Sequence, residues 1–139
     1  MDSIKNFADI IEQFREYAER PALIFFGDSG RTEYSYRQLH ADIVSTAARL
    51  HERGITRGDS AAVISQSRYE WITAALAVIY NGGTVIPVDT QAEDKTLSHI
   101  LSDSSAKAVF TTLEIRDRLQ QFSPDINYIL LDELQENQD

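Results

Sequence analysis

The amino-acid sequence predicts a three-layer α/β/α fold with a mostly parallel sheet preceded by an antiparallel hairpin. Four short runs from residue 60 onward are apolar without interruption, which is typical of strands buried on both faces. Stretches with helical spacing of apolar residues separate these runs. Strand and helix therefore alternate as they do in parallel sheets with right-handed crossovers. The four runs are residues 61–65, 84–88, 107–111 and 128–132.

Composition and charge indicate a globular protein of one domain. The 139 residues match one domain of ordinary size, and 42% of them are hydrophobic and 25% charged. The chain has no cysteine, which excludes a disulfide framework and is compatible with the cytoplasm. No apolar run approaches the roughly 18 residues of a membrane span. A net charge of −9 with scattered basic residues disfavours binding to nucleic acid or anionic lipid. We therefore expect a cytoplasmic protein with no membrane span and no nucleic-acid partner.

The first expected elements are a helix and a hairpin. Apolar residues recur every three or four positions over residues 7–18, which predicts an amphipathic helix that ends before Pro21. Residues 22–26 and 32–36 have the composition of strands. The segment between them, residues 27–31, contains two glycines and an aspartate, which are typical of a hairpin loop.

This loop contains Ser29 within the letters GDSG, which surround the nucleophile of many serine proteases. A catalytic serine requires a general base, an orienting group and an oxyanion hole. The three histidines, His40, His51 and His99, all fall in expected helices without a supporting motif. We therefore interpret Ser29 as a solvated turn residue. A serine hydrolase is the alternative, and labelling with a fluorophosphonate probe would reveal it.

Four helix starts are predicted by serine or threonine followed three residues later by glutamine or glutamate, the capping box. Gly54 is expected to end the first of these helices in a left-handed conformation. The second helix, residues 71–80, is apolar on nearly every face and is expected to be buried most deeply. If the domain itself covers this helix, the hypothesis of a free-standing domain is supported. If the helix presents a large apolar patch, a missing partner domain is indicated. The four boxes are Ser35 with Gln38, Ser67 with Glu70, Thr90 with Glu93 and Thr111 with Glu114.

The bends that contain glycine disfavour a phosphate loop. A nucleotide-binding loop runs from a strand through glycines into a helix N-terminus, where amides and the helix dipole attract the anion. Gly82 and Gly83 instead follow a helix and precede a strand, and Gly58 lies in a bend of the same polarity. Pro87 lies in the following strand and cannot donate to the ladder, so we expect a bulge, a strand end or an edge there.

We assign no catalytic, cofactor-binding or metal-ligating residue. Asp89 and Thr90 follow a strand, where α/β folds bind ligands, but a lone carboxylate is more often a helix cap. The histidines lack the paired spacing of metal ligands and are expected to be exposed or partly packed. Tyr69 and Trp71 are expected in the core and at its rim.

Apolar spacing also predicts a third helix around residues 97–101 and a shorter fourth helix over residues 115–122. We therefore expect a single α/β domain over residues 1–132. Residues 133–139 are polar and acidic without an apolar stripe, which is typical of a linker or a cut end.

Several segments, taken in order, resemble the opening of AMP-forming acyl-CoA synthetases of the adenylate-forming superfamily. SYRQL at residues 35–39 resembles the Tyr-x-x-Leu helix start of this family. Gly54, Gly58 and Asp59 resemble its Gly-x-x-x-Gly-Asp turn before a buried strand.

Two further blocks continue this resemblance, GGTVIPVD at residues 82–89 and HILSDSSAKAVFT at residues 99–111. SRYEW at residues 67–71 is most similar to the long-chain fatty acyl-CoA ligase branch, in which proline commonly stands in place of Tyr69. The resemblance extends over roughly residues 4–132, with all blocks in the right order.

The resemblance implies a parent enzyme that activates a carboxylate with ATP and Mg²⁺ to an acyl adenylate and then transfers the acyl group to coenzyme A. The family's phosphate loop, its Tyr-Gly-x-Thr-Glu motif and its C-terminal lysine do not occur in this sequence. We therefore expect an N-terminal scaffold fragment that is not catalytic alone, holds no cofactor and has the remainder of the parent chain as its partner. The alternative is a free-standing α/β interaction or regulatory module, which a reading frame ending at Asp139 would favour.

Overall fold

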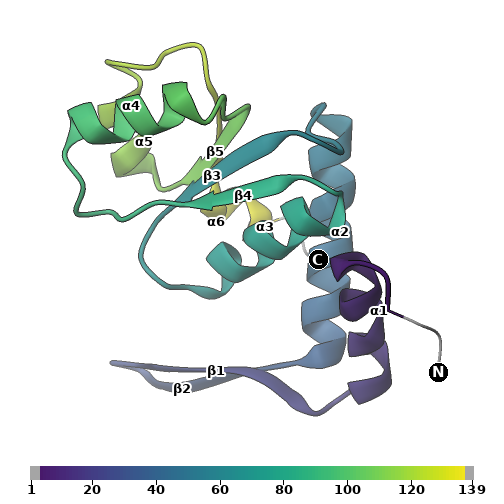
Figure 1. Ribbon diagram of the computed structural model, residues 1–139. Helices are drawn as coiled ribbons and strands as arrows, with labels where there is room; N and C mark the ends of the chain where they lie inside the picture. Colours follow the sequence, from purple (N-terminus) through teal and green to yellow (C-terminus); the bar gives the residue numbers. More distant parts are fainter. Residues whose placement is uncertain (1–3, 137–139) are drawn as a thin grey trace.

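The computed structural model describes residues 4–136, and these form six helices and six strands (Figure 1). The helices are α1 (Phe7–Tyr17), α2 (Tyr36–Glu52), α3 (Tyr69–Tyr80), α4 (Asp94–Asp103), α5 (Leu113–Leu119) and α6 (Leu131–Glu136). The strands are β1 (Pro21–Gly27), β2 (Gly30–Ser35), β3 (Ser60–Ile64), β4 (Thr84–Pro87), β5 (Ala108–Thr111) and β6 (Asn127–Leu130). No helix among these residues is both long and apolar enough to cross a membrane.

Four strands form a parallel sheet in the order β4-β3-β5-β6. Val63 of β3 pairs with Pro87 of β4 on one side and with Phe110 of β5 on the other, and Phe110 pairs with Ile129 of β6. Pro87 is the last residue of β4, an edge strand, so its missing N–H leaves no gap between two strands. The predicted parallel sheet and the strand end at Pro87 are both confirmed.

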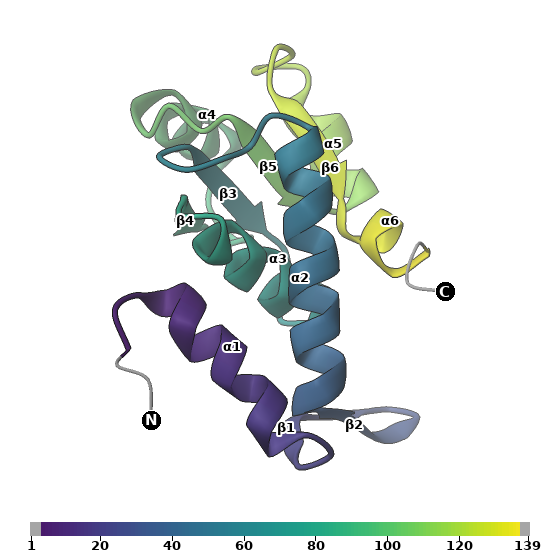
Figure 2. The ribbon, with the colours of Figure 1, turned by 90° about the vertical axis from the view of Figure 1, so that its right-hand side faces the viewer.

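Alternate side chains of the central strands fill two separate cores, which makes the fold three-layered. Ala61 and Val63 pack with α2, α3 and α6 on one face of the sheet. Ala62 and Ile64 pack with α4 and α5 on the other face. All four residues are completely inaccessible to solvent. In both ribbon views α4 and α5 lie on one side of the sheet and α2 and α3 on the other, whereas α1 lies beside α2 (Figures 1 and 2). The predicted fold class is confirmed.

The predicted hairpin is confirmed and lies apart from the parallel sheet. β1 and β2 pair antiparallel, with Gly27 opposite Gly30 and the two loop residues Asp28 and Ser29 between them. Gly30 has a φ of +115°, a conformation that residues with a β-carbon rarely adopt. The hairpin projects from the body beyond the start of α2 (Figures 1 and 2).

The strand β2 begins two residues before the predicted range and ends one residue before its predicted end, because Ser35 caps the next helix. The Ser35 Oγ accepts a hydrogen bond from the Gln38 amide at 3.1 Å, and Tyr36 is already helical. Gly54, with a φ of +83°, follows the end of α2 as predicted, and the Ile55 amide donates to the Leu50 carbonyl at 2.8 Å.

The other three predicted capping boxes are wrong. α3 begins at Tyr69 with Arg68 as its N-cap, so Ser67 lies too early to cap it. α4 begins at Asp94 after Glu93, and α5 begins at Leu113 after Thr112. None of these three starts has a side-chain cap. Thr111 belongs to β5 instead, where its Oγ1 donates to the Ile64 carbonyl at 2.6 Å.

Helix α3 is the buried helix that its composition predicts. None of its residues is exposed, and Ala74, Ala77 and Val78 are at most 1% accessible. Trp71 is half-buried against the core that this helix shares with the sheet. Residues 4–136 therefore bury seven of the twelve residues of α3 and partly bury the other five.

The C-terminal part differs from the expectation of a polar tail from residue 133. Residues 131–136 form α6, and Leu131 and Leu134 are buried against the core beneath α2 and α3. The two leucines are three positions apart, which gives a stripe too short to stand out among the polar residues around it. Residues 137–139 lie outside the described part of the chain, and the expected division into domain and tail stays a prediction.

We predict that Gly83→Ala lowers the free energy of unfolding by about 1–3 kcal/mol, the usual cost of overpacking. A β-carbon at Gly83 would lie 2.8 Å from the Asp59 carbonyl oxygen and 3.0 Å from a methyl carbon of Val78. At Gly27 a β-carbon would meet nothing within 4 Å. Urea denaturation of both variants measures the difference. Equal destabilisation by Gly27→Ala and Gly83→Ala would contradict the close contact at Gly83.

Candidate functional site

The carboxyl ends of β3, β4 and β5 meet at one edge of the parallel sheet, where they border an open cleft. The strand order reverses here, because the chain passes from β3 to β4 on one side and then returns to β5 on the other. Such switch points are where open α/β sheets bind ligands. The cleft has a volume of about 500 Å³. It is lined by Ser65, Gln66, Ser67, Arg68, Thr90, Gln91, Thr112, Glu114, Ile115 and Arg118.

Hydroxyl and amide groups dominate this lining. The Ser65 Oγ donates to the Gln66 carbonyl at 2.8 Å, which shapes the loop after β3. Both arginines of the lining already bind carboxylates, Arg118 through a hydrogen bond to Asp94 on α4. Glu114 is exposed and has no ion pair within residues 4–136. The cleft therefore offers a hydrogen-bonding surface without an uncompensated positive charge.

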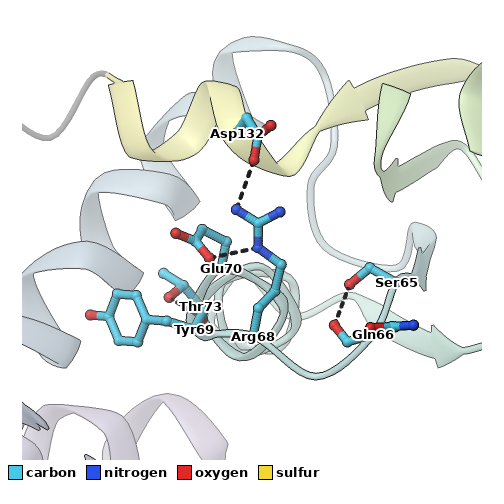
Figure 3. Close-up of polar contacts among 7 residues, drawn as sticks. All are labelled: Ser65, Gln66, Arg68, Tyr69, Glu70, Thr73 and Asp132. Atoms are coloured by element: carbon cyan, nitrogen blue, oxygen red, sulfur yellow. Dashed lines mark hydrogen bonds and ion pairs between the residues drawn. The ribbon is translucent and has the colours of Figure 1, made fainter. Parts of the chain in front are cut away.

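Arg68 joins the loop after β3 to two other parts of the fold (Figure 3). Its Nε donates to a Glu70 carboxylate oxygen at 2.8 Å, and its Nη2 donates to Asp132 of α6 at 2.7 Å. Glu70 is only 6% exposed, whereas the Asp132 side chain is 75% exposed. The guanidinium thereby neutralises a buried carboxylate and ties the wall of the cleft to the helix that follows the last strand.

Tyr69, the next residue, connects this wall to the helical layer and to the hairpin. Its hydroxyl donates a hydrogen bond to the carboxylate of Asp42 on α2. Its ring stacks on that of Tyr34 from β2, with centroids 3.8 Å apart and an angle of 4° between the planes. Burial raises the pKa of Asp42 above its usual range, although the hydrogen bond from Tyr69 acts in the opposite direction. Tyr69 is buried, as predicted.

A second polar cluster lies between α1, α2 and α3. One carboxylate oxygen of Glu12 accepts a hydrogen bond from the Tyr80 hydroxyl at 2.9 Å and lies 3.2 Å from the His40 Nε2. The hydrogen bond from Tyr80 is the main cause that lowers the pKa of Glu12. This cluster fastens α1 to the body at a distance from the cleft.

The histidines and Ser29 are not brought together. Ser29 lies exposed at the hairpin turn, and no hydrogen bond joins it to a histidine in the described residues. His40 is half-buried, whereas His51 and His99 are exposed. The His99 Nε2 lies 3.1 Å from the Asp103 Oδ2. Residues 4–136 hold no group of three or more potential metal-ligating side chains. The interpretation of Ser29 as a solvated turn residue is confirmed.

The amides of the glycine bends are engaged within the fold. The Gly83 amide donates to the Val78 carbonyl at 2.9 Å, and the Gly82 amide to Ile79 at 2.9 Å. The Gly58 amide donates to the Gly82 carbonyl at 3.1 Å, which joins the two bends. The bends run from helix to strand, as predicted, and do not form a cradle for phosphate.

Asp89 was expected to cap a helix, but it caps a turn. Its Oδ1 accepts a hydrogen bond from the Gln91 amide at 2.9 Å, and α4 begins only at Asp94. The role of Arg68 was not predictable from its neighbours, because Ser67 and Glu70 have the spacing of a capping box. A glutamate followed directly by the apolar run of α3 is the signal that could have revealed a buried carboxylate in need of a cationic partner.

Comparison with known proteins identifies a family. Residues 10–138 match the model of a family described as AMP-binding enzymes. The chain is 35% identical over 115 residues to enterobactin synthase component F of Shigella flexneri, a match that covers 82% of this chain and 8% of that protein. It is 25% identical over 117 residues to 4-hydroxybutyrate–CoA ligase 2 of Metallosphaera sedula, with 79% and 21% covered.

Solved structures show the same fold. The fatty acyl-adenylate ligase of L. pneumophila, solved with acyl adenylate and pyrophosphate, superposes with a TM-score of 0.81 at 20% identity, covering 95% of this chain and 24% of that one. The O-succinylbenzoate coenzyme A synthetase of Bacillus subtilis, solved with AMP, also has a TM-score of 0.81, at 23% identity, with 96% and 33% covered.

The matches support a broad family and leave the long-chain fatty acid branch unconfirmed. The similar proteins include both synthases and a CoA ligase. The chain spans about a fifth or less of the curated relatives named above and at most a third of the two solved chains.

We predict that Tyr69→Phe lowers the free energy of unfolding by about 1–3 kcal/mol at neutral pH, because it leaves the buried Asp42 carboxylate without its donor. The hydrogen bond lowers the pKa of Asp42, so its loss raises that pKa further in the folded variant. The destabilisation relative to wild type should therefore grow as the pH rises through the pKa of Asp42 and shrink below it. Denaturation between acidic and neutral pH measures this trend.

Tyr34→Phe is the matched control, since the Tyr34 hydroxyl makes no hydrogen bond among the described side chains and the ring can still stack on Tyr69. Its effect on stability should be small and independent of pH over the same range. A loss in Tyr69→Phe that does not vary with pH would contradict the assigned role of Asp42.

We predict that the two contacts of Arg68 differ in energy despite nearly equal lengths. Two substitutions remove the ion pair between Arg68 and Glu70. Glu70→Gln leaves the arginine paired with the exposed Asp132. Arg68→Leu leaves the buried Glu70 carboxylate without a cation. Arg68→Leu should cost about 3 kcal/mol or more, because an uncompensated buried charge remains. Asp132→Asn should cost below about 1 kcal/mol, as exposed ion pairs do. Equal losses in Arg68→Leu and Asp132→Asn would contradict this assignment.

Proposed function

The chain belongs to the AMP-binding enzyme family, and we propose that it serves as the N-terminal part of an ATP-dependent ligase that activates a carboxylic acid as its acyl adenylate. The observation that carries this proposal is the match of residues 10–138 to the family together with an open cleft at the carboxyl edge of the sheet. Residues 65–68 would form one wall of the substrate site, to which other parts of the enzyme add the chemistry.

The described residues do not fit ATP or Mg²⁺ by themselves. The glycine-bend amides donate to backbone carbonyls, and the arginines of the cleft are already paired with carboxylates. No cluster of three potential metal ligands occurs within residues 4–136. ATP, Mg²⁺ and coenzyme A therefore enter the proposal through the complete enzyme, and this segment acts as scaffold and cleft wall.

For the finer specificity we propose a long-chain fatty acid as the carboxylate and coenzyme A as the acceptor, in the cytoplasm. The support is the SRYEW segment at residues 67–71 and the similarity to a CoA ligase. The competing candidate is the adenylation unit of a large synthase, which the 35% identity to enterobactin synthase component F favours. The two candidates differ in the acid that they activate.

A free-standing interaction or regulatory module is the alternative outside catalysis. The specific observation in its favour is that residues 4–136 bury most of α3 and leave no residue of this most apolar helix fully exposed. A module of this kind would fold cooperatively alone and would have no catalytic partner encoded with it.

We predict that the protein encoded by the complete reading frame catalyses ATP–pyrophosphate exchange that depends on long-chain fatty acids. The panel should also contain short-chain fatty acids, aryl acids and amino acids, and the 139-residue chain should be assayed in parallel. The isolated chain should show neither exchange nor heat of ATP–Mg²⁺ binding in calorimetry, because its described residues lack an anion cradle.

Each other result has a definite meaning. Exchange that depends only on amino or aryl acids would replace the fatty acid proposal with the synthase alternative. Micromolar binding of ATP–Mg²⁺ by the isolated chain would overturn its role as a scaffold. A reading frame that ends at Asp139, with no exchange activity, would favour the free-standing module.

A further inference from the structure

The loop after β3 forms one wall of the cleft, and few contacts hold it in place. Ser65 is buried, whereas Gln66 and Ser67 are exposed. The backbone amides of residues 65–67 make no hydrogen bond to any residue in the described part of the chain. The Ser65 hydroxyl donates only within the loop, to the Gln66 carbonyl at 2.8 Å. The position of this wall is therefore set mainly at its two ends.

The two ends of the wall are held in different ways. At the first end the Thr111 Oγ1 donates to the Ile64 carbonyl at 2.6 Å, and both residues are completely buried. At the other end Arg68 is the N-cap residue of α3, and its side chain makes no capping hydrogen bond. The start of α3 thus lacks the side-chain contact that commonly fixes a helix start.

The Arg68 guanidinium makes two other contacts instead (Figure 3). Its Nε binds Glu70 at 2.8 Å, and its Nη2 binds Asp132 on α6 at 2.7 Å. The contact with Glu70 joins close neighbours in the chain. The contact with Asp132 spans 64 positions and joins this end of the wall to a different helix.

We propose that Arg68 is a positioning residue, which fixes the wall formed by residues 65–67 relative to α6 by binding Glu70 and Asp132 at the same time. The effect on catalysis rests on the proposed function, because the position of the wall matters only when a substrate occupies the cleft. The link itself does not depend on which surfaces the remainder of the enzyme covers, since both contacts are made inside this domain.

The lining of the cleft limits which part of a substrate the wall can face. Of the ten residues around the cleft only Ile115 is apolar, and it is 9% exposed. Pockets that hold apolar ligands are lined mainly by apolar and aromatic side chains. The chain of a fatty acid therefore finds little apolar surface here. We infer that a displaced wall weakens the binding of different acids to the same degree, whatever their chain length.

Two substitutions test the inference in the protein encoded by the complete reading frame. Arg68→Lys keeps a positive charge beside Glu70 but lacks the planar fork that holds two carboxylates. Asp132→Ala removes the outer partner. In ATP–pyrophosphate exchange each variant should raise KM for the acid at least about twofold, as expected for the loss of one ion pair, and should retain kcat. The factor should be equal for all acids that support the reaction.

The double variant separates one shared contact from two independent effects. If both substitutions act through the same link, their combination should raise KM no more than Arg68→Lys alone. Hydrogen–deuterium exchange reports the link without any substrate. The Trp71 and Ile72 amides donate to the Arg68 carbonyl at 3.1 and 3.4 Å, and both should exchange with deuterium faster in the two single variants and in the double variant.

Glu133→Ala is the matched control. Glu133 follows Asp132 in the first turn of α6 and forms an ion pair with Arg53 at the end of α2, and neither residue lines the cleft. This variant should leave KM and the deuterium exchange of Trp71 and Ile72 unchanged.

The two measurements distinguish failure of this inference from failure of the proposed function. Faster deuterium exchange in the variants of a protein that lacks pyrophosphate exchange activity would overturn the proposed function and leave the link to α6 established. Unchanged deuterium exchange, an unchanged KM in an active enzyme, additive effects in the double variant, or an equal effect of Glu133→Ala would each overturn the role of Arg68.

Discussion

The rest of the structure depends on the complete burial of two adjacent strands, β3 and β5. Their alternating side chains must satisfy two cores at once, so neither face of the sheet can be left open. Ala61 and Val63 require the layer of α2, α3 and α6, while Ala62 and Ile64 require α4 and α5. With both faces covered, only the ends of these strands remain accessible. The cleft lies at the carboxyl one of these two ends.

The elements that were predictable from the sequence are those in which one local pattern has one structural meaning. Uninterrupted apolar runs identified all four parallel strands, and Pro21, Gly54 and Pro87 marked ends that the structure retains. The direction of the glycine bends was also readable, because it depends only on the order of helix and strand. Even the unusual burial of α3 followed from its apolar composition.

The candidate site was less predictable, because its contacts join residues far apart in the chain. Ser35 and Ser67 are followed by the same spacing, yet only Ser35 caps a helix. Helix α3 begins too late for Ser67 to cap it, and Glu70 instead binds Arg68, which also binds Asp132, 64 positions along the chain. A window of a few residues contains no information about that third partner. The helix α6 was missed for a related reason, since its two buried leucines are recognisable only against the core that they contact.

The first turn of α3 connects features that otherwise belong to separate parts of the molecule. Arg68 faces α6 and the wall of the cleft, whereas the adjacent Tyr69 binds Asp42 of α2 and stacks on Tyr34 of the hairpin. Arg68 and Tyr69 each bind a buried carboxylate, that of Glu70 and that of Asp42 respectively. Burying a carboxylate is costly unless its hydrogen-bond donor stays in place. The positions of the cleft wall and of the hairpin are therefore coupled through one rigid helix start. A hairpin that would be marginal alone is thereby held in a fixed orientation relative to the body.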